Sequence, residues 1–163
     1  MPWSRPSPRA TKSCHGADVT AFWEDKALAD LDADQWEQLC DRCGRCCLLK
    51  LEDADSGEVV YTGVSCKLLD IERVRCTDYA RRRQRVADCV ALDAGLAGTT
   101  AWLPATCAYR LRAEGKPLPD WHPLVSGDPG SVHAAGISIA GRAVSERFVH
   151  PAALAEHIIR WVE

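Results

Sequence analysis

CDRCGRCC, residues 40–47, places four cysteines within eight consecutive positions, and whatever these thiols bind must organise the fold around them. Cysteines separated by two residues in a tight turn can direct both sulfurs at one cation, and Gly44 suits a turn that needs a positive φ. Unbound cysteine usually packs as a small buried hydrophobe. The charged neighbours Asp41, Arg42 and Arg45 argue against that role for all four thiols. The spacing therefore predicts a metal site.

The C-x2-C-x2-C part of this stretch also matches three of the four ligands in a ferredoxin-type iron–sulfur pattern, whose fourth ligand comes from elsewhere in the chain. The proline that ends that pattern is absent, since Leu48 follows Cys47. Adjacent side chains such as those of Cys46 and Cys47 point in different directions on a helix or a strand. We therefore expect this pair to serve two centres, or one centre and the core. A disulfide between adjacent residues is strained and is not favoured.

Four further cysteines follow at wide spacing, and the ninth, Cys14, lies near the N-terminus and is interpreted as a bystander. Eight thiols would supply two four-thiolate sites or one polynuclear site, although one or two of them could be buried core residues. The histidines beyond the last cysteine stand at no usual zinc-site spacing. We expect core or surface roles for them, with His122 and His133 the best-placed exceptions. The candidate metal ligands are Cys40, Cys43, Cys46, Cys47, Cys66, Cys76, Cys89 and Cys107.

The composition fits one domain whose folding bound metal would stabilise. We expect residues 1–17 to be a disordered arm and residues 18–163 to be a single cysteine-cluster metal-binding domain. Much of the 47% apolar content is alanine and only 7% of residues are aromatic, so the core is modest. A net charge of -3 argues against a nucleic-acid partner. No run approaches the roughly 18 apolar residues of a membrane span, so no membrane partner is expected.

The N-terminal residues lack the apolar stretch of a secretory signal, which predicts a cytoplasmic location. Thiols stay reduced in that compartment, so nine cysteines indicate metal binding rather than a disulfide framework. The arginine-rich run 81–85 is predicted to be a solvated helix face. An RNA- or phosphate-binding patch, or guanidinium groups that offset an anionic metal–thiolate centre, are the alternatives.

Apolar periodicity and turn signals predict a small α-rich α+β fold organised around a metal–thiolate centre. Asp32, followed by Gln35, forms a capping-box pattern that starts a helix ending at the first cysteine. Apolar arms on either side of the polar turn 53–57 predict a β-hairpin directly after the cluster. The other expected elements are largely helical structure in 65–94, helices at 104–115 and 151–163, and a short late strand pair within 136–145.

Three longer segments stand out together: LCDRCGRCCLLKLED at 39–53, WLPATCAYRLRAEGKPLPDWHPLVSG at 102–127 and ISIAGRAVSE at 137–146. They resemble the YcgN-like bacterial cysteine-cluster family, which carries a C-x2-C-x2-C-C domain described as zinc- or iron-chelating. The resemblance runs from Phe22 to Trp161 and includes every candidate ligand. It departs at Val74, where a further cysteine is expected, so we do not expect this position to be an essential ligand. The resemblance implies metal chelation and a ligand set rather than a reaction.

These features predict a metal-binding protein that holds an iron–sulfur cluster or iron through cysteine thiolates, with a redox or electron-transfer role and a protein redox partner. A structural zinc protein or adaptor is the first alternative, since zinc would staple an alanine-rich core. A metal-delivery factor is the second alternative. An iron–sulfur oxidoreductase activity would fit the first interpretation, whereas no H-E-x-x-H run of a hydrolytic zinc enzyme occurs.

Overall fold

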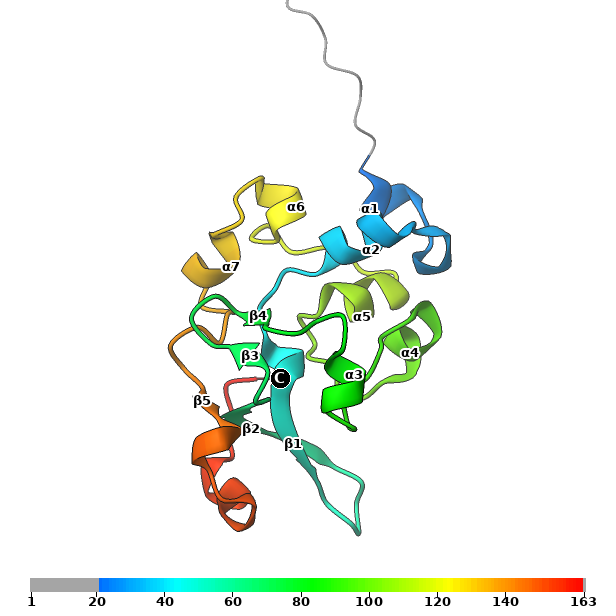
Figure 1. Cartoon of the computed structure of the whole chain (residues 1–163). Coiled ribbons are helices and arrows are strands. Elements are labelled where there is room, and N and C mark those ends of the chain that lie inside the picture. Colours follow the sequence, from blue (N-terminus) through cyan, green and yellow to red (C-terminus); the bar gives the residue numbers. More distant parts are fainter. Residues whose placement is uncertain (1–20, 163) are drawn as a thin grey trace, which may run out of the picture.

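The computed structural model describes residues 21–162, so Cys14 and the predicted arm 1–17 lie outside the described part of the chain. Short helices surround two small sheets (Figure 1), which confirms the α+β class. None of the helices in residues 21–162 has the length and apolar character that a bilayer crossing requires. The α-helices are α1 Phe22–Asp25, α2 Ala33–Leu39, α3 Arg82–Arg85, α4 Ala94–Thr99, α5 Ala108–Ala113, α6 Pro123–Ser126 and α7 Ser131–Ala134. The 3-10 helices are η1 Leu28–Asp30, η2 Arg45–Cys47, η3 Glu146–Phe148 and η4 Pro151–His157, and the strands are β1 Leu48–Glu52, β2 Val59–Ser65, β3 Leu69–Asp70, β4 Arg75–Cys76 and β5 Val144–Ser145.

Helix α2 forms where the capping pattern predicts it. The Asp32 side chain accepts the backbone N–H of Gln35 at 2.9 Å, and the Gln35 side chain accepts that of Asp32 at 3.2 Å, which completes the capping box. On the inner face, Trp36 packs against Tyr109 of α5 with ring centroids 4.5 Å apart. The helix therefore ends with Cys40 beside α5.

Strands β1 and β2 form the predicted hairpin directly after the cysteine stretch. The Asp53 side chain accepts the backbone N–H of Ser56 at 2.7 Å, which shapes the polar turn. β1 and β2 pair antiparallel, and β5 pairs in parallel with the end of β2. The predicted late strand pair is wrong, because a single strand of 2 residues, β5, forms there. The residues before β5 bond elsewhere, since the backbone N–H of Ile139 donates to the carbonyl of Cys43 at 2.9 Å.

The stretch 65–94 is mostly turns, so the prediction of largely helical structure is wrong. β3 and β4 form a short antiparallel hairpin, and α3 is the one helix that lies wholly within this range. The Asp70 carboxylate accepts the backbone N–H groups of Glu72 and Arg73, and Val74 has a φ of 50°. Together these features turn the chain away from a helical path. The helices predicted at 104–115 and 151–163 are shorter than expected and form α5 and η4.

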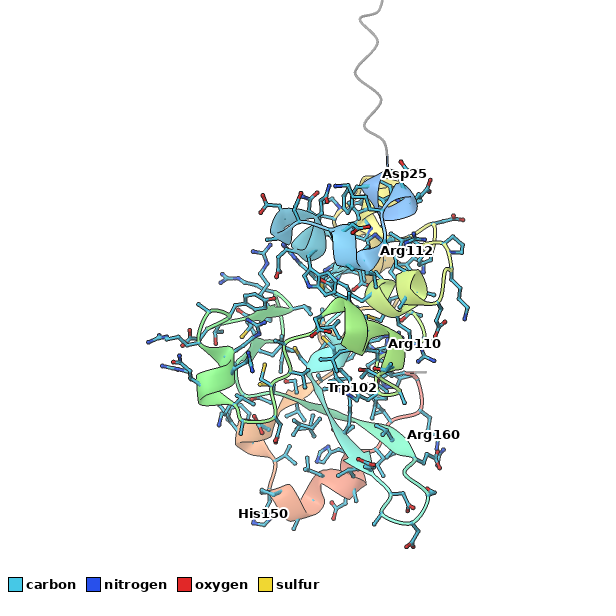
Figure 2. All side chains as sticks on the ribbon, turned by 90° about the vertical axis from the view of Figure 1, so that its right-hand side faces the viewer. Asp25, Trp102, Arg110, Arg112, His150 and Arg160 are labelled. Atoms are coloured by element: carbon cyan, nitrogen blue, oxygen red, sulfur yellow. The ribbon has the colours of Figure 1, made fainter. Side chains whose placement is uncertain are left out.

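The described part of the protein has two hydrophobic clusters, and different cysteines pack against each. The α core contains residues of α2, α4 and α5, and partly buried Cys40 and Cys107 pack against it. The β core contains residues of both sheets, and Cys47 packs against it. Figure 2 shows Arg112 of α5 at one end of the molecule and His150, before η4, at the other. The buried members are Leu39, Ala97, Ala108, Tyr109 and Leu118 in the α core, and Leu48, Tyr61, Leu69, Val74, Ile139 and Val162 in the β core.

Candidate metal centre

The cysteine stretch runs from the end of α2 through a loop and η2 into β1. Gly44, just before η2, has a φ of 77°, as the predicted turn requires. A Cβ atom at this position would lie 2.4 Å from Cγ1 of Val74 and 2.8 Å from Cγ1 of Ile139. Val74, where the resemblance led us to expect a further cysteine, is a core residue that packs on the turn. The turn is held tightly between two side chains of the β core.

Cys40, Cys43, Cys46 and Cys107 are called the first group, because Cys46 raises the pKa of each of the other three thiols. They come from the end of α2, the loop after it, η2 and the residue before α5. Burial raises the pKa of Cys40 and of Cys43 above the ordinary range and that of Cys107 to about 11, and thiols of the same group add to each rise. Backbone amides two residues further along lower the pKa of Cys40 and Cys43, and those of Arg110 and Tyr109 lower the pKa of Cys107, as groups that stabilise thiolates do.

Cys47, Cys66, Cys76 and Cys89 form a second group, from η2, the residue after β2, β4 and the turn after α3. The backbone N–H of Cys66 donates to the carbonyl of Cys47 at 2.9 Å, which joins two of these segments directly. Burial raises the pKa of Cys66, and the thiols of Cys89 and Cys76 add to the rise. The Cys66 sulfur accepts the backbone N–H of Leu68 at 3.5 Å, a bond that stabilises a thiolate.

The two groups meet at Cys46 and Cys47. The interaction between these two side chains lowers the pKa of Cys46, with a further contribution from Lys50, and raises the pKa of Cys47. The Lys50 ammonium donates to the carbonyl of Cys46 at 2.9 Å and lies 5.0 Å from the ring centroids of both Tyr61 and Trp102. Trp102 is labelled in Figure 2. The Lys50 ammonium is thus held by two aromatic rings next to Cys46 and Cys47.

These groups consist of neighbouring thiols and are not formed coordination spheres. Within residues 21–162, no three His, Cys, Asp or Glu side chains converge closely enough to surround one ion. All eight cysteines of the two groups are free thiols. Metal binding would require these side chains to turn toward a common point, and their assignment as ligands stays a prediction. No cysteine lines either of two surface hollows, of about 110 and 390 Å³.

The chemistry of the first group fits a cation. Asp41 is only 6% exposed, and its Oδ1 accepts the backbone N–H of Cys43 at 2.9 Å. Its Oδ2 is buried and has no hydrogen-bond partner among the described residues. The buried Arg45 does not serve it, because its Nε donates to the carbonyl of Ile137 at 2.8 Å. A buried carboxylate oxygen without a partner is costly, and a zinc or iron ion among thiolates would satisfy it.

His122, one of the two histidines named as exceptions, is instead a core residue like those expected among the others. It is fully buried, and its Nε2 and Nδ1 both face backbone groups. Because the N–H of Leu124 can only donate, Nδ1 accepts it, and the proton on Nε2 is therefore donated to the carbonyl of Leu39. Both ring nitrogens are thus used, and neither faces the thiol groups as a ligand. His133 is exposed.

The unfolding free energy is expected to fall as the pH drops below about 6.5, because His122 must stay neutral. Burial lowers the pKa of His122, so between that lowered value and its ordinary value the unfolded chain binds a proton that the folded chain does not. His122→Asn should cost about 1–3 kcal/mol at neutral pH, since the Leu39 carbonyl loses its donor. Urea unfolding over about pH 7.5 to 5 should show this difference shrinking with acid. Parallel pH profiles for the two proteins would contradict the assignment.

The arginine run 81–85 is partly paired locally. Arg81 and Arg85 contact the Asp78 carboxylate at 3.0 and 2.9 Å, and the Arg82 guanidinium lies 3.7 Å from the ring centroid of Tyr79. Arg81 and Arg85 are also exposed, which agrees with the predicted solvated face. Sequence reasoning missed two other charged residues, Asp41 and Lys50. Their only signal was their position within and just after the cysteine stretch.

Comparison of the sequence with known proteins identifies the family to which the chain is related. Residues 39–108 match the family described as "CxxCxxCC: Putative zinc- or iron-chelating domain". A UPF0260 protein of Cellvibrio japonicus is 55% identical over 141 residues, which cover 86% of this chain and 96% of that protein. A UPF0260 protein of Azotobacter vinelandii is 56% identical over 143 residues, or 88% of this chain and 96% of that protein.

A third relative, the UPF0260 protein of Pseudomonas aeruginosa, is 57% identical over 130 residues, or 80% of this chain and 87% of that protein. No solved structure matches the chain. The aligned regions are long and the identities are high, so the resemblance seen in the sequence is confirmed. The chain belongs to the bacterial UPF0260 family, within the wider group that carries the CxxCxxCC zinc- or iron-chelating domain.

Proposed function

We propose that the protein binds metal through cysteine thiolates at two adjoining centres, and that these centres hold iron–sulfur clusters with an electron-transfer or redox role. The family's zinc- or iron-chelating domain supports the metal-binding part. The observation that carries the proposal is the stretch 40–47 with its four cysteines, whose Cys47 carbonyl accepts the backbone N–H of Cys66 at 2.9 Å. The division of the eight thiols into two groups of four that meet at Cys46 and Cys47 is part of the proposal. Four thiolates are the ligand set of a cubane cluster and also of structural zinc.

Three local features favour a cluster over a single ion. The C-x2-C-x2-C run is the three-cysteine part of a ferredoxin-type site. The Lys50 ammonium, beside Cys46, would offset the negative charge of a cluster ligated by thiolates. The backbone N–H of Leu68 donates to the sulfur of Cys66, and hydrogen bonds to sulfur are one of the means by which proteins set cluster potentials. Electrons would then pass to or from a protein redox partner, in a reducing compartment such as the cytoplasm.

Structural zinc is the second candidate, and the two separate cores favour it. Cys40 and Cys107 pack on the α core, whereas Cys47 packs on the β core. Metal held by both groups would therefore tie together two clusters that are each small. Four-thiolate zinc sites contribute on the order of 10 kcal/mol to the folding of small domains. In this case the metal would be a staple without a redox role.

Protein purified without oxygen or chelators is expected to be brown, with broad visible absorption that bleaches on reduction and with iron and acid-labile sulfide in similar amounts. Colourless protein with two equivalents of zinc would instead support the structural role. In either case, removal of the metal should lower the unfolding free energy by several kcal/mol, since binding energy is folding energy at such sites. Metal analysis that finds neither iron nor zinc would refute the proposal.

A further inference from the structure

Asp41 stands out among the acidic residues because it is buried beside four thiols without a cation. Its side chain is part of a residue only 6% exposed, and Oδ2 has no hydrogen-bond partner among the described residues. The ion pairs found within residues 21–162 involve other acids, namely Asp70, Asp78 and Glu114. The Asp41 carboxyl is therefore a polar group whose second oxygen is matched by nothing in the described protein.

Asp78 provides a comparison, because it also has a buried Oδ2 without an assigned hydrogen bond. That oxygen lies 3.0 Å from a guanidinium nitrogen of Arg81 and 2.9 Å from one of Arg85, so its charge is balanced. No arginine or lysine does the same for Asp41 in the described residues, and the nearby Arg45 is turned toward Ile137. Within residues 21–162, Asp41 therefore lacks the neighbouring guanidinium groups that balance the charge of Asp78.

The carboxyl of Asp41 is also fixed in place. Its Oδ1 accepts the N–H of Cys43, two residues further along, at 2.9 Å, which leaves Oδ2 as the free oxygen. Asp41 directly follows Cys40 in the chain, and its bond to the Cys43 N–H keeps the carboxyl beside these two members of the first group. Glu146 also accepts a backbone N–H, from Lys67 at 2.7 Å, but it differs because it is only partly buried and its second oxygen is not among the buried atoms without a partner.

We infer that Asp41, through Oδ2, is an oxygen ligand of the metal held by the first group, so that this centre is mixed sulfur and oxygen while the second is sulfur only. The inference rests on the proposed metal binding. A cation at Oδ2 would remove the cost of a buried, unmatched carboxylate. Carboxylate oxygen is an accepted ligand of zinc and of iron beside other donors. The Cys43 N–H holds the other oxygen and orients the group for this role.

Asp41→Asn tests this role with little change in shape. The Asn side-chain oxygen can still accept the Cys43 N–H, so a purely structural role would survive, whereas the negative charge and the strong donor are lost. In anaerobic titrations of metal-free protein with Co²⁺ alone, we expect two equivalents to bind to the unmodified chain. In Asp41→Asn, one of them should bind at least about 10-fold more weakly and with shifted visible bands. Asp53→Asn is the matched control, since this exposed carboxylate also shapes a turn by accepting N–H groups.

A second measurement needs no variant. X-ray absorption of the unmodified protein loaded with Zn²⁺ should show oxygen at about 2.0–2.2 Å in addition to sulfur at about 2.3 Å. A first shell of sulfur alone, or an Asp41→Asn titration identical to that of the unmodified chain, overturns the inference and leaves the proposed function standing. If the unmodified chain binds no Co²⁺ or Zn²⁺, this inference fails, whereas the iron, sulfide and zinc analysis described above decides the proposed function.

Discussion

Replacement of Cys43 by serine is expected to remove the metal of the first group and to leave that of the second. Cys43 is the one buried cysteine among the eight that the structure describes, and Cys40 and Cys46 belong to the same stretch 40–47. Loss of an outer-shell partner already weakens metal binding by about 10–100-fold, so loss of a ligand should exceed about 100-fold. Metal analysis after gel filtration in a competing chelator should therefore find about half the metal of the unmodified protein, one of two four-thiolate centres.

Two matched variants give this experiment its controls. Cys66→Ser should remove the other half of the metal, because Cys66 belongs to the second group. Cys14→Ser, outside the described residues, should change neither metal content nor stability. If Cys43→Ser and Cys66→Ser each remove all the metal, the eight cysteines serve one polynuclear centre. If Cys43→Ser behaves like Cys14→Ser, the ligand assignment is wrong.

The features that follow from neighbouring residues were predictable. The capping box of α2 spans four positions, from Asp32 to Gln35, and the sequence indicates both partners. The hairpin after the cluster depends on a turn whose polar residues are also adjacent in the chain. Gly44 was expected at a positive φ because a C-x2-C turn demands it, and its φ is 77°. Each of these predictions needs only the order of residues along a short segment.

The features that failed or were missed depend on distant partners. The side chain of Arg45 bonds to Ile137, 92 residues away, and no local pattern indicates that pairing. The division of the widely spaced cysteines has the same origin, since Cys107 joins the first group only because the α5 region packs beside α2. The late strand β5 also pairs with β2, whose Val64 lies about half the chain length before its partner Val144, which is why a local strand pair was predicted in its place.

Gly44→Ala is expected to be among the most destabilising single substitutions in the chain. A non-glycine residue at a φ of 77° costs about 1–2 kcal/mol. The new Cβ would also lie 2.4 Å from Val74 and 2.8 Å from Ile139, and forcing an extra methyl into a packed core costs about 1–3 kcal/mol. The total of about 2–5 kcal/mol is a large part of the 5–15 kcal/mol that stabilises a typical domain. Urea unfolding of the metal-free and metal-loaded variant would measure it.

Gly57 separates the two causes of this effect. Its φ is 71°, close to that of Gly44, but a Cβ there would meet no atom within 4 Å. Gly57→Ala should therefore cost only the backbone strain of about 1–2 kcal/mol. In the Gly44→Ala background, Val74→Ala should restore part of the lost stability, although it removes buried surface when made alone. Equal losses in Gly44→Ala and Gly57→Ala, with no rescue by Val74→Ala, would mean that the turn bearing the cysteines is not clamped by the β core. The two thiol groups would then be free to rearrange around metal without the core.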